Sequence, residues 1–519
     1  MMTTRLRRLL LAVPLALLAL MASGLLLADR LTPAATGEPS QALPVAGPPT
    51  PLDTELAPLL AAHPGQTGVV WLSDGLDAFA ARSVVSRRAG RSLDVMYYIW
   101  KDDVPGHLMA RELYQAAERG VRVRLLLDDL NAHGLDPQMM ALDAHPNIEL
   151  RLYNPIRNRD GVWRIVEMLQ RVFSINHRMH NKAWIADGQV AIIGGRNIGA
   201  EYFDARDDVN FQDLDLLLAG PATVQANTIF DRYWNSPAVV PIAALNRKRP
   251  DQLQRLLALT DSQSRLDQAQ PYLERVARRL DEPAVRGQTI NLWSGQLRIL
   301  SDPPLKHRQG DRRDWIIGPI LQDLRSPRQQ ALLISPYFVP GRQGTEEMLA
   351  QARRGIDIGV VTNSLAANDV AAVHSGWQAY RPALVDAGVA VHELKRDTRH
   401  RHPGLALPFG SSGASLHTKA YVVDGRRGFV GSFNLDPRST NLNTEMGVFF
   451  DDPALGQRLV DEYRQLAAPA ASYHVLRDTH GALVWRDAAG TLHGHEPDTG
   501  WWLRAWVRLL GWLPIESQL

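Results

Sequence analysis

A histidine, a lysine and an asparagine recur at the same spacing in two short segments of this chain. The segments read HNKAWIADGQVAIIGGRN and HTKAYVVDGRRGFVGSFN. The repeated residues are His180, Lys182 and Asn197 in the first segment, and His417, Lys419 and Asn434 in the second. A shared internal register in two distant segments indicates a duplicated unit. We therefore expect the two segments to act together in one functional site.

The histidine and the lysine of each segment have the types and the spacing needed to act on a phosphodiester. Side chains two positions apart on a strand point to the same face, so Lys182 places a positive charge beside His180. A free imidazole, with a pKa of about 6.5, can attack phosphorus or move a proton at neutral pH. If the two copies face each other, one imidazole can attack while the other protonates the leaving oxygen, and the lysines stabilise the phosphate charge. This chemistry needs neither a metal ion nor a cofactor.

Each segment also contains an aspartate, Asp187 or Asp424, that directly precedes a glycine. Asp-Gly pairs are typical of tight turns, so we favour a turn role over a catalytic role, although both aspartates belong to the repeated pattern. The copies differ where Gly195 of the first corresponds to Ser432 of the second. Ser432 is therefore a candidate for an additional phosphate contact.

The flanking sequence predicts α/β units around both segments. Residues 92–100 and 121–127 are short apolar runs typical of buried strands, and residues 105–119 between them have helical spacing that ends at Gly120. A strand, a helix and a strand at this spacing indicate a βαβ unit with parallel strands. The same order of elements returns in the second half at residues 331–338, 344–354 and 356–362.

The repeat divides the chain into two similar α/β domains, residues 55–240 and 290–465. Residues 241–289 are expected to form a helical connection between them. Residues 466–519 are a tail, in which residues 473–492 predict a hairpin with its turn at residues 488–490.

The end of the tail carries Trp501, Trp502, Trp506 and Trp512, with Arg504 and Arg508 between them. An amphipathic segment of this kind can lie in a membrane interface. The alternative is a helix that packs on the domain through its tryptophans.

The N-terminus predicts a membrane segment within residues 1–30. Three arginines precede an uncharged run at residues 9–28, which is long enough to span a bilayer. We favour an uncleaved anchor over a cleaved signal, whose apolar region usually has roughly 7–15 residues. The arginines would stay in the cytoplasm, with the rest of the chain outside the cytoplasmic membrane. Residues 31–54, rich in proline, predict a linker, with folded structure beginning near residues 56–60.

The composition excludes several classes of function. The chain has 519 residues, a net charge of +2 and no cysteine. Disulfides, thiolate metal sites and thiol catalysis are therefore absent. The near-neutral charge disfavours nucleic acid as a partner, since strong binding usually needs a basic patch.

The pattern H-x-K-x4-D followed by G-[GS]-x-N, present twice, resembles the phospholipase D superfamily. Flanking segments such as SLDVMYYIWKDD, NHRMHNKAWIADG, SPYFVPGRQG and LLGWLPIESQL are similar to the bacterial cardiolipin synthases, especially their C-type branch. The resemblance implies two phospholipase D-like α/β sandwich domains that share one active site. It also implies transfer of a phosphatidyl group from a donor phospholipid to phosphatidylglycerol through a phosphohistidine.

By this resemblance His180 is the nucleophile and His417 the general acid and base, although the symmetry of the site leaves their order open. Lys182, Lys419, Asn197 and Asn434 are expected to bind phosphate. Asp213 and Glu445 match the acids that orient the histidines through Nδ1, and Asp215 is a rival to Asp213.

Two further functions remain as alternatives. A hydrolase of the same fold, acting on lipid or less readily on nucleic acid, differs only in using water as the acceptor. An inactive lipid-binding or scaffold protein ranks last, because both motifs are intact. The expected partners are phosphatidylglycerol, with phosphatidylethanolamine as a second donor candidate, the membrane, and a helper protein as an option. The expected location is the bacterial cytoplasmic (inner) membrane, with the catalytic domains on the periplasmic side.

Several other residues are expected to lie outside the site. His177 precedes His180 by three positions, but no second ligand cluster accompanies it, so we expect no metal site. His374, Trp377 and Tyr380 have helical spacing and are expected in the core, or as lining residues of the lipid cleft.

Overall fold

The computed structural model describes most of the chain after its N-terminal segment. The described residues are 37–132, 134–159, 161–171, 174–207, 209–245, 263–281, 290–306, 311–396, 416–513 and 515–518. The expected anchor at residues 1–30 lies outside them. Within the described ranges, no helix is long and apolar enough to cross a membrane.

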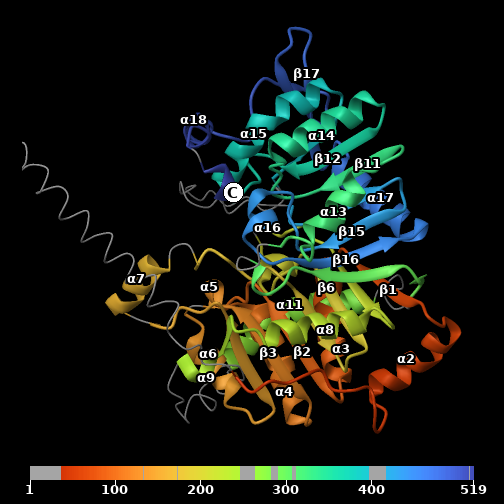
Figure 1. The fold of residues 1–519 in the computed structure, drawn as a ribbon, viewed down its shortest axis with the longest axis vertical. Coiled ribbons are helices and arrows are strands. Elements are labelled where there is room, and N and C mark those ends of the chain that lie inside the picture. Colours follow the sequence, from red (N-terminus) through yellow and green to blue (C-terminus); the bar gives the residue numbers. More distant parts are fainter. Residues whose placement is uncertain are drawn as a thin grey trace, which may run out of the picture.

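The first domain, in the lower half of Figure 1, is built on a nine-stranded sheet in the order β8-β4-β3-β2-β5-β6-β7-β1-β9. Its strands are β1 (Thr67–Leu72), β2 (Ser92–Tyr97), β3 (Arg122–Asp128), β4 (Ile148–Tyr153), β5 (Ala183–Ala186), β6 (Val190–Gly194), β7 (Asp215–Ala219), β8 (Val239–Pro241) and β9 (Leu292–Ser294). Its helices are α2 (Pro51–Ala62), α3 (Gly75–Arg88), α4 (Val104–Glu118), α5 (Asp129–Ala132), α6 (Asp136–Asp143), α7 (Gly161–Gln170), α8 (Thr223–Trp234), α9 (Ile242–Leu245) and α11 (Gln263–Asp281).

The second domain, in the upper half of Figure 1, has a ten-stranded sheet in the order β10-β16-β15-β14-β11-β12-β13-β17-β18-β19. Its strands are β10 (Leu297–Ser301), β11 (Gln330–Ile334), β12 (Asp357–Asn363), β13 (Ala390–Leu394), β14 (Ala420–Val423), β15 (Arg427–Gly431), β16 (Met446–Asp451), β17 (Ser472–Arg477), β18 (Leu483–Arg486) and β19 (Leu492–His493). Its helices are α13 (Ile317–Leu324), α14 (Gly341–Arg353), α15 (Ala371–Asp386), α16 (Pro437–Asn441), α17 (Pro453–Ala467) and α18 (Trp501–Leu510).

The two sheets share one topology, which confirms the predicted internal repeat. In each sheet three neighbouring strands are parallel, β2-β3-β4 in the first and β11-β12-β13 in the second. An antiparallel pair follows, β5-β6 or β14-β15, and it carries the sequence motif. The predicted βαβ unit is β2-α4-β3, and Gly120 ends its helix with a φ of 89°.

The motif pair is a tight hairpin in both domains. Asp187 and Gly188 have φ values of 52° and 72°, and Asp424 and Gly425 have φ values of 54° and 61°. Two successive positive φ angles define a type I′ turn, for which Asp-Gly is a preferred sequence. This confirms the turn role predicted for the two aspartates.

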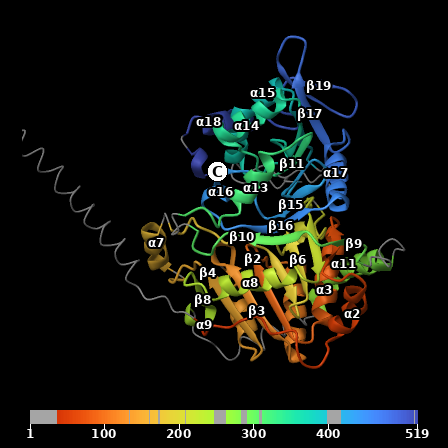
Figure 2. The ribbon, with the colours of Figure 1, turned by 45° about the vertical axis from the view of Figure 1, so that its right-hand side comes forward.

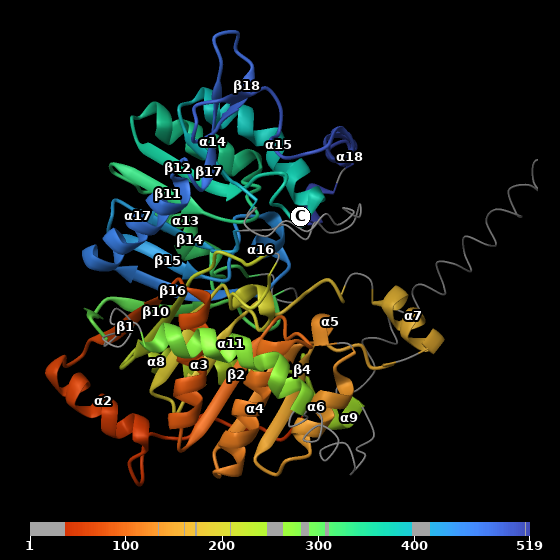
Figure 3. The ribbon, with the colours of Figure 1, turned by 180° about the vertical axis from the view of Figure 1, so that it is seen from behind.

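The two sheets pack face to face around a shared core, as Figure 2 shows with β15 and β16 lying above β6. One buried apolar cluster contains Ile193 and Leu216 from the first sheet and Val430 and Met446 from the second. The helices α8 and α17 also contribute to this cluster, whereas α3, α4, α14 and α15 cover the outer faces (Figure 3). The shared core holds the two motif hairpins against each other.

The structure differs from the predicted boundaries at both ends of the domains. Helix α2 begins at Pro51, where Thr50 accepts a hydrogen bond from the backbone N–H of Asp53 in a capping box. The preceding segment is not a free linker: Arg151 donates to the carbonyl of Glu38 at 2.6 Å, and Arg124 donates to that of Ser40 at 3.1 Å. Backbone contacts of this kind leave no apolar periodicity in the sequence.

The tail also departs from the prediction. Strand β17 pairs with β13, so the second sheet continues beyond residue 465. The turn between β17 and β18 lies at residues 478–482, and the turn at residues 487–491 joins β18 to β19 instead. Helix α18 packs on α15 through Val507, which is fully buried, while Trp501, Trp502 and Trp512 are 71%, 61% and 83% exposed. Three of the four tryptophans therefore do not pack on the domain, whereas Trp506 is half-buried.

Candidate active site

Each of the two motif histidines hydrogen-bonds to an acid from the opposite domain. His180 Nδ1 lies 2.8 Å from Glu445 Oε2, and His417 Nδ1 lies 2.5 Å from Asp213 Oδ2. His180 and Asp213 belong to the first domain, while His417 and Glu445 belong to the second. Neither half of the chain can assemble a complete histidine–acid pair alone.

The backbone brings the crossed pairs together. The N–H of His180 donates to the carbonyl of Thr444 at 2.9 Å, next to Glu445. The N–H of His417 donates to the carbonyl of Gln212 at 2.7 Å, next to Asp213. Each histidine is therefore held by a short parallel bridge across the domain interface, at Met179↔Thr444 and Gln212↔Leu416.

The structure distinguishes Asp213 from its rival Asp215. Asp215 Oδ2 forms a buried ion pair with Arg82 at 2.8 Å, and its Oδ1 accepts from the N–H of Arg196 at 3.2 Å. Asp215 thus supports the backbone before Asn197 rather than orienting a histidine.

The two lysines are buried beside the histidines. Lys182 Nζ donates to the carbonyl of His180 at 2.7 Å, and Lys419 donates to the carbonyl of His417. Both lysines are 1% exposed. Burial lowers the pKa of Lys182 well below its usual range and lowers the pKa of Lys419 to about 8. A bound phosphate anion would stabilise their charged forms.

The environment keeps both imidazoles neutral at neutral pH. Burial and the two lysines lower the pKa of His180 and of His417 well below the usual range. Burial also raises the pKa of Asp213, and raises the pKa of Glu445 to about 7. A neutral imidazole with its Nδ1 held by an acid presents Nε2 either as a nucleophile or as a proton carrier.

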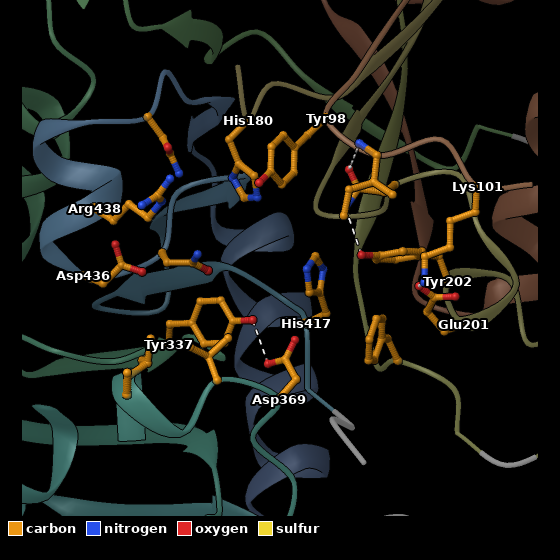
Figure 4. A pocket seen from close by; sticks show the side chains of 18 of the residues that line it. Tyr98, Lys101, His180, Glu201, Tyr202, Tyr337, Asp369, His417, Asp436 and Arg438 are labelled. Atoms are coloured by element: carbon orange, nitrogen blue, oxygen red, sulfur yellow. Dashed lines mark hydrogen bonds and ion pairs between the residues drawn. The ribbon is translucent and has the colours of Figure 1, made fainter. Parts of the chain in front are cut away.

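The rings of the two histidines point into one cavity, shown in Figure 4. This cavity has a volume of about 630 Å³ and is lined from both domains. Tyr98 lies edge-on to His180 with ring centroids 5.0 Å apart, and Phe211 stacks on His417 at 5.4 Å. Aromatic walls around the histidines exclude water and favour a substrate with apolar parts.

The two asparagines line the cavity in different ways. The amide of Asn197 accepts from the N–H of Ile99 at 3.1 Å and donates to the hydroxyl of Tyr202 at 3.0 Å. The side-chain oxygen of Asn434 is buried and has no hydrogen-bond partner among the described residues. Asn434 is therefore the asparagine that is freer to contact a ligand.

Ser432 lies behind the site instead of facing the cavity. It is fully buried, and its hydroxyl donates to Glu445 Oε2 at 2.5 Å. The expected phosphate contact is therefore corrected: Ser432 supports the acid that orients His180.

The motif aspartates lie at the far end of the hairpin strands from the histidines. The carboxylate of Asp187 accepts hydrogen bonds from the backbone N–H groups of Gly90, Arg91 and Ser92 at 2.7–3.2 Å. Asp424 accepts equivalent bonds from residues 328–330. Each aspartate lies five residues beyond its lysine, about 16 Å along a strand at 3.3 Å per residue, so neither aspartate touches the reacting atoms.

The structure adds residues that the motif did not reveal. The cavity is also lined by Lys101, Glu201, Tyr337, Asp369, Asp436 and Arg438. These side chains come from loops after strands and from α16, so their shared location follows only from the fold. In the sequence, the predicted carboxyl ends of β2 and β11 could have indicated this region, because ligands bind beyond the carboxyl ends of parallel strands.

Two buried acids position the catalytic segments from behind. Asp128, at the end of β3, accepts from the N–H of Met179 at 2.8 Å, directly before His180. Asp302 accepts from the N–H of Glu445 at 3.0 Å and from Lys306 Nζ at 2.9 Å. Each acid fixes the backbone next to a residue of the His180–Glu445 pair.

The residues expected outside the site do lie outside it. His374 is fully buried and its Nε2 lies 3.1 Å from Glu496, while Trp377 donates to Glu393 at 2.9 Å. Tyr380 donates to Glu516 at 2.5 Å. His177 Nδ1 donates to the carbonyl of Leu442 at 3.2 Å. Across the described ranges, no group of three or more His, Asp or Glu residues could hold a metal ion.

The fold and the site define a class of protein. Two duplicated α/β domains that place paired histidines in one cavity, each beside a buried lysine, are typical of the phospholipase D superfamily. The family described as "Cardiolipin synthase, PLD-like domain" matches this chain twice, at residues 87–234 and 320–467. The chain belongs to this family.

Known proteins agree with this assignment. Cardiolipin synthase C of Escherichia coli is 40% identical over 480 residues, which cover 90% of this chain and 99% of that protein. Cardiolipin synthase 2 of Bacillus anthracis is 25% identical over 413 residues, 79% of this chain and 67% of that protein. Among solved structures, the phosphatidylserine synthase of Haemophilus influenzae has the same fold, with a TM-score of 0.57, 15% identity, and coverage of 85% of this chain and 92% of that one.

Proposed function

We propose that this chain is a phosphatidyltransferase that forms cardiolipin from phosphatidylglycerol and a donor phospholipid through a phosphohistidine. One observation carries the proposal: two histidines, each held through Nδ1 by an acid of the other domain, face one cavity beside two buried lysines. The full-length match to a cardiolipin synthase supports the choice of substrates.

In the first step, His180 Nε2 attacks the phosphorus of the donor. The negative charge of the bound phosphate favours the protonated form of His417, whose Nδ1–H is held by Asp213. The bond between phosphorus and the headgroup oxygen breaks, and the His417 imidazolium gives its Nε2 proton to that oxygen and becomes a neutral imidazole. The leaving alcohol departs, and the phosphatidyl group stays on His180. Glu445 accepts a hydrogen bond from His180 Nδ1–H and stabilises the positive charge that develops on the ring.

In the second step, a hydroxyl of phosphatidylglycerol replaces the leaving alcohol. His417, now unprotonated at Nε2, takes the proton of this hydroxyl, and the oxygen attacks phosphorus. The phosphorus–nitrogen bond breaks and returns His180 to its starting form. Lys182 and Lys419 stabilise the charge on the phosphate oxygens in both steps, so the chemistry proceeds without a metal ion.

The identity of the acceptor separates this function from lipid hydrolysis. Water in place of phosphatidylglycerol would give phosphatidic acid through the same two steps. We favour the lipid acceptor because aromatic side chains flank both histidines and limit the access of water.

The decisive experiment reconstitutes the purified full chain in vesicles of phosphatidylglycerol alone, or of phosphatidylglycerol with labelled phosphatidylethanolamine. Cardiolipin as the main product supports the proposal, and the label in the product identifies the donor. Phosphatidic acid as the only product would support the hydrolase. Activity that appears only after addition of a membrane extract would indicate a helper protein.

We further propose that residues 1–30 anchor the chain in the bacterial cytoplasmic membrane, with both domains on the periplasmic side. The arginines before the uncharged run at residues 9–28 motivate this topology. Externally added protease should cleave the domains in spheroplasts, and protection of both domains would contradict the topology.

A further inference from the structure

Helix α7 has its polarity reversed relative to an ordinary surface helix. Its only buried side chain is that of Glu167. The carboxylate of Glu167 accepts from the backbone N–H groups of Arg157 at 2.9 Å and Asn158 at 2.8 Å. The charged residue thus faces the body of the protein and attaches the helix to it.

The apolar residues of α7 face outward instead. Val162, Trp163, Ile165 and Leu169 are 72%, 71%, 59% and 71% exposed. Positions 162, 165 and 169 lie on one face of a helix. An amphipathic surface helix in water normally turns this face to the core, so α7 requires an apolar partner outside the domain.

Helix α18 has a second outward apolar surface. Val507 attaches α18 to the domain, and Trp501, Trp502, Leu509, Trp512 and Leu513 remain exposed around it. Arg508 is exposed on the same helix. Tryptophan with arginine is the composition that favours the interface of a bilayer containing anionic lipid.

The two surfaces flank the mouth of the catalytic cavity. In all three views α7 and α18 lie on the same side of the molecule, with the C-terminus between them (Figures 1–3). Gln518, near that end, lines the cavity and accepts a hydrogen bond from Asn176 at 2.8 Å. Arg438, which also lines the cavity, donates to the carbonyl of Asn176 at 3.2 Å. The segment after α7 and the end of the chain therefore meet at the cavity.

We propose that α7 and α18 form one docking face that seats the cavity mouth on a lipid bilayer. A donor lipid could then place its phosphate at the histidines while its acyl chains stay in the bilayer. A second copy of the chain fits less well, because a protein seated on both helices would cover the mouth between them. The inference rests on the proposed function only in taking the substrate to be a membrane lipid.

The absence of cysteine from the sequence allows a direct test in the full chain. Single cysteines at Ile165→Cys and Trp512→Cys are labelled with an environment-sensitive fluorophore. The control is Val84→Cys on α3, where the valine is 42% exposed and the helix lies away from the docking face in all views. The labelled proteins are reconstituted in vesicles of phosphatidylglycerol and phosphatidylethanolamine.

The labels at positions 165 and 512 should shift their emission to the blue and be quenched by lipids that carry a quencher in the upper acyl chain. The label at position 84 should be quenched by aqueous iodide instead. Equal iodide quenching at all three positions would refute the proposal. So would energy transfer between labels at position 165 in detergent without vesicles, which would identify a second copy as the partner.

The same measurement in a His180→Ala background separates docking from chemistry. Docking needs no turnover, so the blue shift should persist when transfer is lost. An unaltered chain that transfers lipid but shows no blue shift would contradict only the docking face. An unaltered chain that shows the blue shift but transfers no lipid would contradict only the proposed function.

A functional readout complements the fluorescence. The variant Trp163→Ser/Ile165→Ser/Leu169→Ser should raise the apparent KM for vesicle lipid by about tenfold or more, since it removes three exposed apolar side chains from the contact. Its kcat with short-chain lipid dispersed in detergent should stay unchanged. The matched control Val84→Ser/Val224→Ser should leave both values unchanged, and an unaltered KM in the triple variant would contradict the proposal.

Discussion

Replacing Glu445 with glutamine should separate the catalytic role of this residue from its cost to stability. Glu445 is fully buried, and its Oε2 is the partner of His180 Nδ1 and of the Ser432 hydroxyl. Burial raises the pKa of this carboxyl from 4.5 to about 7. Glutamine has nearly the same shape and can accept the same hydrogen bonds, but it carries no charge at any pH.

The activity of the variant should fall sharply. The carboxylate fixes the tautomer of His180 and stabilises the positive ring, and loss of a similar acid in histidine–acid pairs lowers kcat by about 10⁴-fold. Because burial raises the pKa of Glu445 to about 7, this carboxyl becomes protonated below pH 7, and kcat/KM of the unaltered enzyme should drop about tenfold per pH unit there. Glu445→Gln should lower kcat by a factor of about 10² or more at pH 8 and remove this acid limb.

The stability of the variant should change with pH in the opposite sense. A raised carboxyl pKa means that the folded chain holds the proton more tightly than the unfolded chain, so the unaltered protein loses stability as the pH rises from 4.5 to about 7. The gap of about 2.5 units corresponds to about 3 kcal/mol at 1.36 kcal/mol per unit. Glu445→Gln avoids this loss.

Urea unfolding of the detergent-solubilised protein at pH 5 and pH 8 measures the effect. Relative to the unaltered chain, the free energy of unfolding of Glu445→Gln should increase by about 2 to 3 kcal/mol between these two pH values. Glu445 Oε1 has no hydrogen-bond partner among the described residues, so the N–H₂ group of glutamine at this place also has none. The free energy that this unpaired group costs does not depend on pH, so it cancels when the stability differences at pH 5 and pH 8 are compared. An equal stability difference at both pH values, or retention of more than about a tenth of the activity, would refute the reasoning.

Three further outcomes follow from the site. Asp187→Ala should lower the free energy of unfolding by about 3 kcal/mol, since three backbone N–H groups lose their acceptor, while the kcat of the folded fraction changes little; a large fall in kcat at unchanged stability would instead make Asp187 catalytic. Burial lowers the pKa of Lys419 to about 8, so its positive charge is present below pH 8 and lost above it, and kcat/KM should decline above pH 8. Arginine stays charged in this range, so Lys419→Arg should shift this decline to higher pH when the rate is measured against pH. Dialysis against EDTA should leave the transfer rate unchanged, because the lysines supply the positive charge at the phosphate; loss of rate that added metal restores would overturn the metal-free mechanism.

Local sequence patterns predict those features of the fold that depend on neighbouring residues. The spacing of His180 and Lys182 follows from the alternation of side chains along an extended segment, and the Asp-Gly turns follow from backbone preferences. The repeat also predicts two like domains, because equal spacing in both halves implies equal structure.

Features that depend on distant contacts could not be predicted in the same way. The acids Asp213 and Glu445 are recognisable as partners of the histidines, but their exchange between domains follows only from the shared core. The position of β17 in the second sheet is set by its pairing with β13, far away in sequence. Ser432 aligns with a glycine, and nothing local shows that its hydroxyl turns toward Glu445.

Helix α7 illustrates a different reason. Its apolar spacing is compatible with an ordinary core-facing helix, and the sequence alone cannot say which face meets the domain. The hydrogen bonds of Glu167 to the loop residues Arg157 and Asn158 decide the orientation, and the apolar spacing of the helix does not encode a side-chain bond to a loop.

The central claim is that His180 carries the phosphatidyl group between the two steps. The purified chain is mixed briefly with a donor lipid labelled at its phosphate and quenched in alkaline detergent, since phosphohistidine is labile in acid. The labelled peptide is then mapped in the unaltered protein and in His180→Ala and His417→Ala, both of which should keep their fold. We predict label at His180 in the unaltered protein, no label in His180→Ala, and no cardiolipin from either variant. Label on His417, or continued cardiolipin formation by either alanine variant, would contradict the account.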